Sequence, residues 1–216
     1  MLHLGKRGSG TVTRVGSTPT GDQETRGTSA GCQTSIDCKG QGNGYDKDDP
    51  YYHSYNLRNE VCSTSVSSCT IDNVNDSLKK NAAPGSDGVN PVTENKPSTI
   101  EFMGIRGGTV YHRVDDENNR IINITQEDHV FYNGIAIRSV VEEGGRIYIN
   151  TFGEGVNRPQ SELLPNRVSW ALNYATAGPG FHSLDHNIHL DVLSRSRDGL
   201  AVLARERQMM EVGRRR

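Results

Sequence analysis

The sequence predicts an α+β fold, in which a small antiparallel sheet of two consecutive hairpins is followed by C-terminal helices, behind a poorly ordered N-terminal leader. Two observations carry this prediction. Between residues 105 and 152, apolar residues alternate with polar ones, as in half-buried strands. Beyond residue 167 they recur at every third or fourth position, as in amphipathic helices.

The leader is predicted from composition. Residues 1 to about 60 are dominated by Gly, Ser, Thr, Asp and Asn, and such a segment buries too little apolar surface to offset the entropy of ordering. The 216-residue chain has a hydrophobic share of 33% and a mean hydropathy of −0.65, which also favours a small domain with a tail. We therefore predict a flexible polar leader at 1–60, a cysteine-pinned short helix and linker at 61–97, and an α+β domain at 98–216.

The four cysteines, Cys32, Cys38, Cys62 and Cys69, all lie in the first third of the chain. Their spacing within pairs is wider than that of zinc ligand pairs, and no histidine pair accompanies them at zinc-finger spacing. Two local disulfides, one joining each neighbouring pair, are the simplest arrangement, and they suit an oxidising destination. Free buried thiols are the alternative.

The first predicted helix covers residues 70–80. Thr70 is suited to the N-cap, Asp72 lies in the first turn, and Lys79 and Lys80 lie at the end, where they complement the helix dipole. A disulfide at Cys69 would hold the start of this helix. The following stretch is rich in Pro, Gly and Asn and is predicted to be a linker that ends near residue 98.

The central hairpin has the most regular pattern. Apolar residues alternate on both sides of Gly144-Gly145, a pair that suits a two-residue hairpin loop. Counting outward from this loop places Val140 opposite Ile149 and Arg138 opposite Thr151. Upstream, residues 105–114 and 121–125 flank a polar turn and are predicted to pair as the first hairpin.

Three helices are expected after the sheet. The first covers 167–177 and is stopped by Gly178-Pro179-Gly180, the second covers 183–194, and the last covers 200–212 before a basic tail. Arginines in the last segment could hold a phosphate backbone or an acidic partner, although interleaved acidic residues favour a solvated helix face.

Charge and hydropathy argue against some classes of protein. The formal net charge of −2 gives no whole-molecule attraction to nucleic acid or to an anionic membrane. No apolar run approaches the length of a membrane helix, and the N-terminus lacks the apolar core of a secretory signal. We expect no membrane span, and export only by means of another polypeptide.

Several short motifs occur together over roughly residues 51–185. They are YYHSYNLRNEVC with a second cysteine at Cys69, APG at 83–85, NIT-x3-HVF-x2-G at 123–134, Arg138, GRIYINTFGEG at 145–155, and Leu172-Asn173 with GPGFHSLD at 178–185. In combination they resemble the C-terminal region of bacterial secreted polymorphic toxins, which are attached to RHS-repeat or filamentous-haemagglutinin carriers.

This resemblance implies that residues 98–216 are an effector domain, secreted as part of a larger carrier and acting in the cytoplasm of a target cell. It implies two partners, the carrier polypeptide and a cognate immunity protein. It does not name the activity, because such carriers bear nucleases, deaminases and ADP-ribosyltransferases, among others.

The residues themselves suggest metal-free cleavage of RNA. Such a reaction needs a base for the 2′-hydroxyl, an acid for the leaving oxygen, and a cation to stabilise the phosphate. The predicted catalytic residues are His129 as base, Arg138 as phosphate clamp, Thr151 as a further donor and His112 as the acid. Asn150 and Arg146 are predicted to bind the substrate. Alternatively, His129 caps a turn through Asp128 and Arg138 pairs with a surface glutamate.

Other chemistries are less well supported. His182, His186 and His189 share one side of a predicted helix with Asp185 nearby, but a polar outer face explains them better than a metal site, so no metal is predicted. An ADP-ribosyltransferase would need an E-x-E after the STS at 63–65, and none follows. Gly153-Glu154-Gly155 is predicted to be a bend at a strand end, so no cofactor is expected.

The competing functional class is a non-catalytic pre-toxin, adhesion or carrier-associated binding module, in which the central hairpin is only a core. The position of His129, Arg138 and Thr151 discriminates between the two classes. An enzyme requires them to converge in an open groove, whereas a structural role allows each to be satisfied by its own neighbours.

Overall fold

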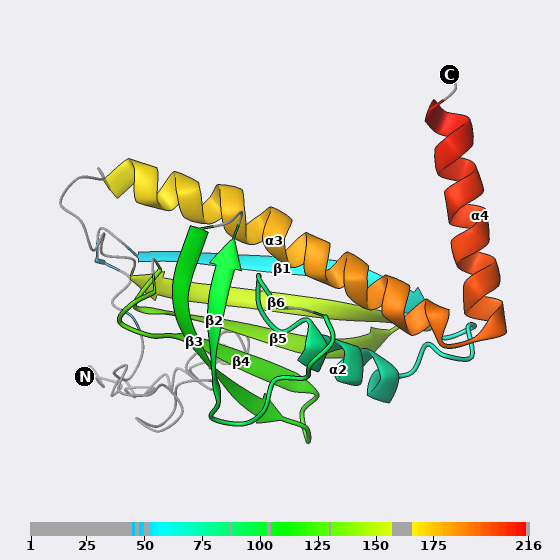
Figure 1. The fold of residues 1–216 in the computed structure, drawn as a ribbon, viewed down its shortest axis with the longest axis horizontal. Coiled ribbons are helices and arrows are strands. Elements are labelled where there is room, and N and C mark those ends of the chain that lie inside the picture. The colour runs from blue at the N-terminus through cyan, green and yellow to red at the C-terminus, as the bar shows by residue number, and fades with distance from the viewer. Residues whose placement is uncertain are drawn as a thin grey trace, which may run out of the picture.

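The computed structural model describes residues 45, 48–49, 52–86, 88–102, 105–129, 131–156 and 166–214. Its centre is one antiparallel sheet of six strands in the order β1-β6-β5-β4-β3-β2 (Figure 1). The strands are β1 (Tyr52–Ser63), β2 (Pro97–Phe102), β3 (Ile105–Asp115), β4 (Arg120–Thr125), β5 (Gly134–Glu143) and β6 (Arg146–Val156). The predicted fold class, an antiparallel sheet followed by C-terminal helices, is confirmed.

Three helices accompany the sheet: α2 (Ile71–Lys80), α3 (Asn166–Ser194) and α4 (Arg197–Arg214). The long helix α3 runs diagonally across one face of the sheet, and α2 lies near the C-terminal end of α3 (Figure 1). Helix α4 turns away from the sheet and stands clear of it (Figure 1). No helix in the described ranges is long and apolar enough to cross a membrane.

Both predicted hairpins are present. Strands β5 and β6 pair with Glu143 opposite Arg146, Val140 opposite Ile149 and Arg138 opposite Thr151, which is the predicted register. Strands β3 and β4 form the other hairpin. The central register was predictable because a two-residue glycine loop fixes the pairing, and Gly144 and Gly145 both have positive φ.

The edge strands differ from the prediction. Strand β1 pairs with β6 along its whole length, although residues 52–60 were expected in the flexible leader. Its exposed and half-buried positions alternate, because one side of the strand faces solvent and the other faces α3. Strand β2 begins at Pro97, inside the predicted linker, and pairs with β3 as the opposite edge. The predicted boundary at residue 98 therefore separates β1 from the other strands of the same sheet, and α2 from the core that it shares with that sheet.

The predicted stop at Gly178-Pro179-Gly180 is wrong. Helix α3 continues through Pro179, so the two helices expected at 167–177 and 183–194 are one. Proline removes one backbone hydrogen bond, but Pro179 is exposed, and the buried side chains that follow it hold the helix on the sheet. These are Phe181, Leu184, Ile188 and Val192.

The main core lies between the sheet and the helices. It joins side chains of β1, β4, β5 and β6 to Val74 and Leu78 of α2 and to Ile188 and Val192 of α3. We call the sheet face that carries this core the inner face. On the outer face, Ile122, Ile124, Ile135 and Ile137 form a second cluster.

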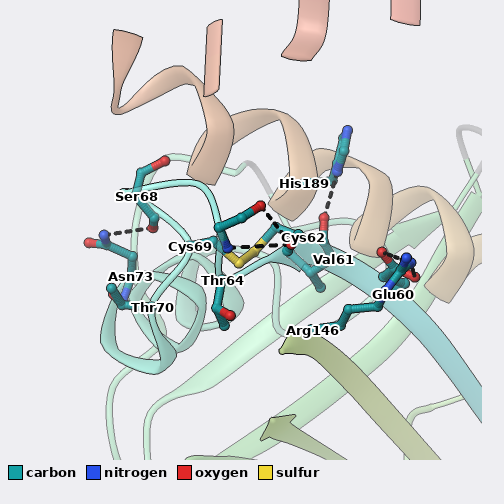
Figure 2. The surroundings of a disulfide bond; sticks show 12 residues. Glu60, Val61, Cys62, Thr64, Ser68, Cys69, Thr70, Asn73, Arg146 and His189 are labelled. Atoms are coloured by element: carbon teal, nitrogen blue, oxygen red, sulfur yellow. Dashed lines mark hydrogen bonds and ion pairs between the residues drawn. A yellow bond between two sulfur atoms is a disulfide. The ribbon is translucent and has the colours of Figure 1, made fainter. Parts of the chain in front are cut away.

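The predicted disulfide between Cys62 and Cys69 is present and links the end of β1 to the start of α2 (Figure 2). Thr70 is the N-cap of α2, as predicted, and its hydroxyl accepts the Asn73 N–H at 3.2 Å. Beside the disulfide, the His189 ring of α3 lies against the Val61 carbonyl oxygen, with Nδ1 at 2.6 Å (Figure 2). The second predicted pair, Cys32 and Cys38, lies outside the described residues.

Candidate functional site

A line of polar side chains crosses the inner face of the sheet. His112 on β3 is directly opposite Asn123 on β4, and Arg138 on β5 is directly opposite Thr151 on β6. Alternate residues of a strand share a face, and Asn123 pairs with Ala136, so Asn123 and Arg138 lie on the same face. These four residues are buried in an otherwise apolar layer, and each requires polar partners.

Arg138 finds its partners inside the protein. Its guanidinium is fully buried, forms an ion pair with Asp185 of α3, and donates to the Asn81 carbonyl oxygen. The Arg138 Nε lies 3.4 Å from the Thr151 hydroxyl. Asp185, itself 3% exposed, also accepts the Asn59 amide of β1 at 2.7 Å. This network joins β5, β6, β1 and α3.

Burial disfavours the charged forms of both Arg138 and Asp185. Desolvation lowers the pKa of Arg138 and raises the pKa of Asp185, while the attraction between the two charges acts in the opposite direction on both. Burial also raises the pKa of the Tyr55 hydroxyl, whose ring lies 6.1 Å from that of Phe181. Arg138 therefore holds the helix on the sheet, and it is not placed to clamp a phosphate from solvent. Its partner is the buried Asp185, and the surface glutamate of the alternative reading is not involved.

Asn150 and Arg146, the two residues predicted to bind the substrate, do not lie beside Arg138. Asn150 is the neighbour of Thr151 along β6 and therefore points to the outer face, where it lies opposite Arg58 and Ser139. Arg146 is exposed at the hairpin turn and pairs with Glu60, with Nη1 2.5 Å from a carboxylate oxygen. The sheet thus directs Asn150 and Arg138 to opposite faces.

His129 lies in the loop between β4 and β5. Its side chain is buried, and its Nδ1 accepts the Phe131 N–H at 3.0 Å. Burial lowers the pKa of His129 to about 4, although the nearby Asp128 opposes the shift. The Asp128 carboxylate accepts the Thr109 N–H and hydroxyl of β3. The loop fits closely there, because a Cβ at Gly108 would overlap the backbone of Asp128 and His129.

His112 belongs to a different group. Its Nδ1 lies 2.7 Å from the Asn123 Oδ1, and its Nε2 lies 2.9 Å from the Ser98 hydroxyl of β2. The Asn123 amide also donates to the Ala82 carbonyl oxygen at 2.9 Å. His112 is 1% exposed, and burial lowers its pKa. Of the four predicted catalytic residues, the structure brings Arg138 and Thr151 into contact inside the core and gives His112 and His129 other partners.

Ser98, Asn123 and the role of Asp185 were not predicted from the sequence. Asn123 carried a signal, because it is a single amide within the apolar strand Ile121-Ile122-Asn123-Ile124, and such a residue must find a buried partner. Ser98 carried none, since it lies in a stretch with the composition of a linker.

Ser98 also lines a pocket of about 300 Å³ between β2 and the connection from α2 to β2. Lys96 is the one charged side chain among the described lining residues. The lining residues are Gly85, Ser86, Asn90, Pro91, Val92, Thr93, Lys96, Pro97, Ser98, Thr99 and Ile100.

His182 and His189 of α3 contact different residues of β1. The His189 ring contacts the Val61 carbonyl oxygen and, through Nε2 at 3.0 Å, Glu206 of α4. The rings of His186 and His189 stack 6.0 Å apart, and His182 lies 3.4 Å from the Asn59 side chain. Within the described residues, no group of His, Cys, Asp and Glu side chains could hold a metal ion.

No family model matches this sequence, and no curated protein matches it. Solved structures show distant likeness. The Zhui aromatase/cyclase from a Streptomyces species is 10% identical, with a TM-score of 0.48, over 68% of this chain and 95% of that one. A Thermus thermophilus protein is 14% identical, with a TM-score of 0.44, over 67% of this chain and 99% of that one. A major latex-like protein from Panax ginseng is 11% identical, with a TM-score of 0.42, over 65% and 97%. These values assign neither a family nor a function.

Proposed function

We propose that this chain is a binding module for a small polar molecule, which occupies the pocket between β2 and the connection from α2. The observation that carries the proposal is the pocket of about 300 Å³, which has the partly exposed residue Ser98 in its wall. This volume is at the lower end of the range of small-molecule sites in proteins. A binding module is the class that the sequence left as the alternative to an enzyme.

The lining suits a small polar ligand. Thr93 and Ser98 carry hydroxyls, and Asn90 carries an amide. Val92 and Ile100 contribute apolar surface, and Lys96 adds a positive charge that would favour an anionic group. A few polar groups in a partly apolar concave site are the usual means by which a pocket orients a ligand.

The predicted ribonuclease site is a poorer basis for a function. Its central residues, Arg138 and Thr151, have no exposed surface, and His129 is 5% exposed. Substrate phosphates could reach Arg138 only after α3, which carries its partner Asp185, had left the sheet. Cleavage of RNA by these residues stays a prediction, and no contact in the described structure favours it.

A fragment screen tests the binding proposal. The oxidised full chain, labelled with ¹⁵N, is titrated with small neutral and anionic polar fragments at millimolar concentration. We expect shift changes confined to residues 85–86 and 90–100. Thr93→Trp should narrow the pocket and weaken binding at least about tenfold, whereas Ser54→Trp on the exposed side of β1 should leave it unchanged. Absence of any fragment that shifts these residues would refute the proposal.

We also propose the route of secretion and the place of action that the resemblance to polymorphic toxins implies. The module would be secreted on a larger carrier and act in a target cell cytoplasm, with the carrier and an immunity protein as partners. Expression of the full chain in a bacterial cytoplasm, with growth and total RNA followed for wild type and His129→Ala, tests it. Toxicity with RNA fragments that the variant abolishes would restore the ribonuclease prediction, and normal growth with soluble protein would argue against an effector.

A further inference from the structure

We propose that Ser98 is a nucleophile for acyl transfer from a small ester, with His112 as its base and Asn123 as the residue that positions the imidazole. The inference rests on the proposed function, because the ester would occupy the same pocket. It adds chemistry to that pocket and uses a set of residues distinct from the predicted ribonuclease set, apart from His112.

Three adjacent strands place these side chains in order. Ser98 on β2 is paired with Val110, two residues before His112 on β3, and His112 is directly opposite Asn123 on β4. All three therefore share the inner face of the sheet. The distances are 2.9 Å from the Ser98 Oγ to the His112 Nε2 and 2.7 Å from the His112 Nδ1 to the Asn123 Oδ1. A hydroxyl, an imidazole and an orienting acceptor in this sequence of contacts are the arrangement of a nucleophile with its base.

The hydrogen-bond partners fix the direction of each bond. The Ala82 carbonyl oxygen can only accept, so the Asn123 side chain must present its NH₂ group to Ala82, at 2.9 Å. The Asn123 Oδ1 then faces His112 and, as an acceptor, requires the proton on Nδ1. The His112 Nε2 is left with its lone pair directed at Ser98, so the Ser98 hydroxyl donates to it. This is the tautomer that a general base needs.

Ser98 is less buried than His112 and Asn123, which suits its role as the nucleophile. His112 is 1% exposed and Asn123 is 4% exposed, whereas Ser98 is partly exposed and lines the pocket. Desolvation lowers the pKa of His112, so the imidazole is neutral at pH 7 and able to accept a proton. A substrate in the pocket can meet the hydroxyl while the base remains shielded from water.

The reaction balances without a cofactor. The Ser98 Oγ bonds to the ester carbonyl carbon while its proton passes to the His112 Nε2. The bond from that carbon to the alcohol oxygen then breaks, and the alcohol leaves with the proton from Nε2. Water attacks the acyl carbon and gives a proton to Nε2, and the Ser98 oxygen leaves and recovers that proton. The products are a carboxylic acid and an alcohol.

The pocket limits the substrate class. A volume of about 300 Å³ is sufficient for a small ester. Lys96 is the one charged group among the described lining residues, so esters with an anionic substituent should react faster than their neutral analogues.

The test is labelling of the oxidised full chain with a small alkyl fluorophosphonate, read by intact mass and peptide mapping. We expect one adduct, on Ser98. Ser98→Ala should abolish it, and Ser54→Ala, on the exposed side of β1, should keep it. His112→Gln should slow labelling roughly 100-fold or more, with an unchanged fold by circular dichroism. Asn123→Ala should mix the two His112 tautomers in ¹⁵N spectra and slow labelling, whereas a merely structural role would leave the labelling rate of the folded variant unchanged.

The outcomes separate the two proposals. Fragment binding without an adduct on Ser98 would overturn the nucleophile and leave the binding module intact. Neither binding nor an adduct would overturn both. An adduct on Ser98 whose rate is the same in folded His112→Gln would overturn the role of His112 as base.

Discussion

Arg138 of β5 and Asp185 of α3 form an ion pair inside the protein, where their side chains are 0% and 3% exposed. The pair connects the middle of the sheet to the helix that covers it. Each partner has further hydrogen bonds, to the Asn81 carbonyl oxygen on one side and from the Asn59 amide on the other. Such a pair adds little net stability when intact, but removal of one partner leaves a buried charge without compensation.

Asp185→Asn should therefore be strongly destabilising. It leaves the Arg138 charge unpaired, and we expect a loss of about 3–5 kcal/mol in the free energy of unfolding. Urea denaturation followed by circular dichroism measures it. Glu60→Gln, which breaks the exposed pair with Arg146, is the control and should have a much smaller effect. Equal midpoints for the two variants would contradict a structural role for Arg138.

His129 should make the protein less stable in acid. Its pKa is about 4 in the folded state and about 6.5 when unfolded, so between these values the unfolded state binds more protons. Stability is therefore lost as pH falls from about 6.5 to about 4, by roughly 3 kcal/mol for this residue. His112, whose pKa is also lowered, contributes with the same sign.

In His129→Asn the amide oxygen can still accept the Phe131 N–H, but the side chain does not titrate. Urea midpoints measured between pH 4 and pH 7.5 should show a shallower acid dependence for this variant than for wild type. If wild type and His129→Asn had the same dependence of the urea midpoint on pH, the pKa of His129 would not be lowered in the folded state.

Gly153→Ala should be destabilising because a Cβ at this position would overlap the ring of Tyr55 on the neighbouring strand. We expect a loss of about 1–3 kcal/mol in the free energy of unfolding, the usual cost of overpacking. Gly178→Ala is the matched control. Nothing lies within 4 Å of its added Cβ, and alanine in a helix should stabilise by up to about 1 kcal/mol. The same direction of change in both variants would contradict the packing of Tyr55.

The Cys62–Cys69 disulfide should contribute to stability through the unfolded state, which it restricts. For a loop of this size the chain-entropy relation gives about 2–3 kcal/mol. The double variant Cys62→Ala, Cys69→Ala leaves the other cysteines unchanged and should lower the free energy of unfolding, measured by urea denaturation, by that amount. A reductant should shift wild type but have much less effect on the double variant. A wild-type midpoint in the double variant would refute this contribution.

Local signals predicted much of the fold. The register of β5 and β6 followed from Gly144-Gly145, and the start of α2 followed from Thr70, because turns and caps depend on a few adjacent residues. Strand β1 was missed because half of its side chains face solvent, so its composition is that of a polar leader. The continuous α3 was missed because its packing on the sheet outweighs the local effect of Pro179.

The site was less predictable than the fold, because its residues contact residues that are distant in the sequence. Arg138 and Thr151 were correctly placed on one face, but the partner that defines their role, Asp185, is 47 residues beyond Arg138. His112 was predicted to be an acid, and the structure places its ring between Asn123 and Ser98, where we propose that it acts as a base. That contact depends on the pairing of β2 with β3, for which the residues around Ser98 give no pattern.

Ser98, His112 and Asn123 form a line of hydrogen bonds that begins at Asn123 and ends at the pocket. The most direct measurement is the ¹⁵N spectrum of the His112 ring between pH 5 and pH 8, for wild type and Ser98→Ala. We predict a ring that is neutral at pH 7 with its proton on Nδ1, a pKa below the usual value of 6.5, and a change in the Nε2 shift when the Ser98 hydroxyl is removed. A ring that titrates near pH 6.5, or an Nε2 shift unaffected by Ser98→Ala, would contradict the account.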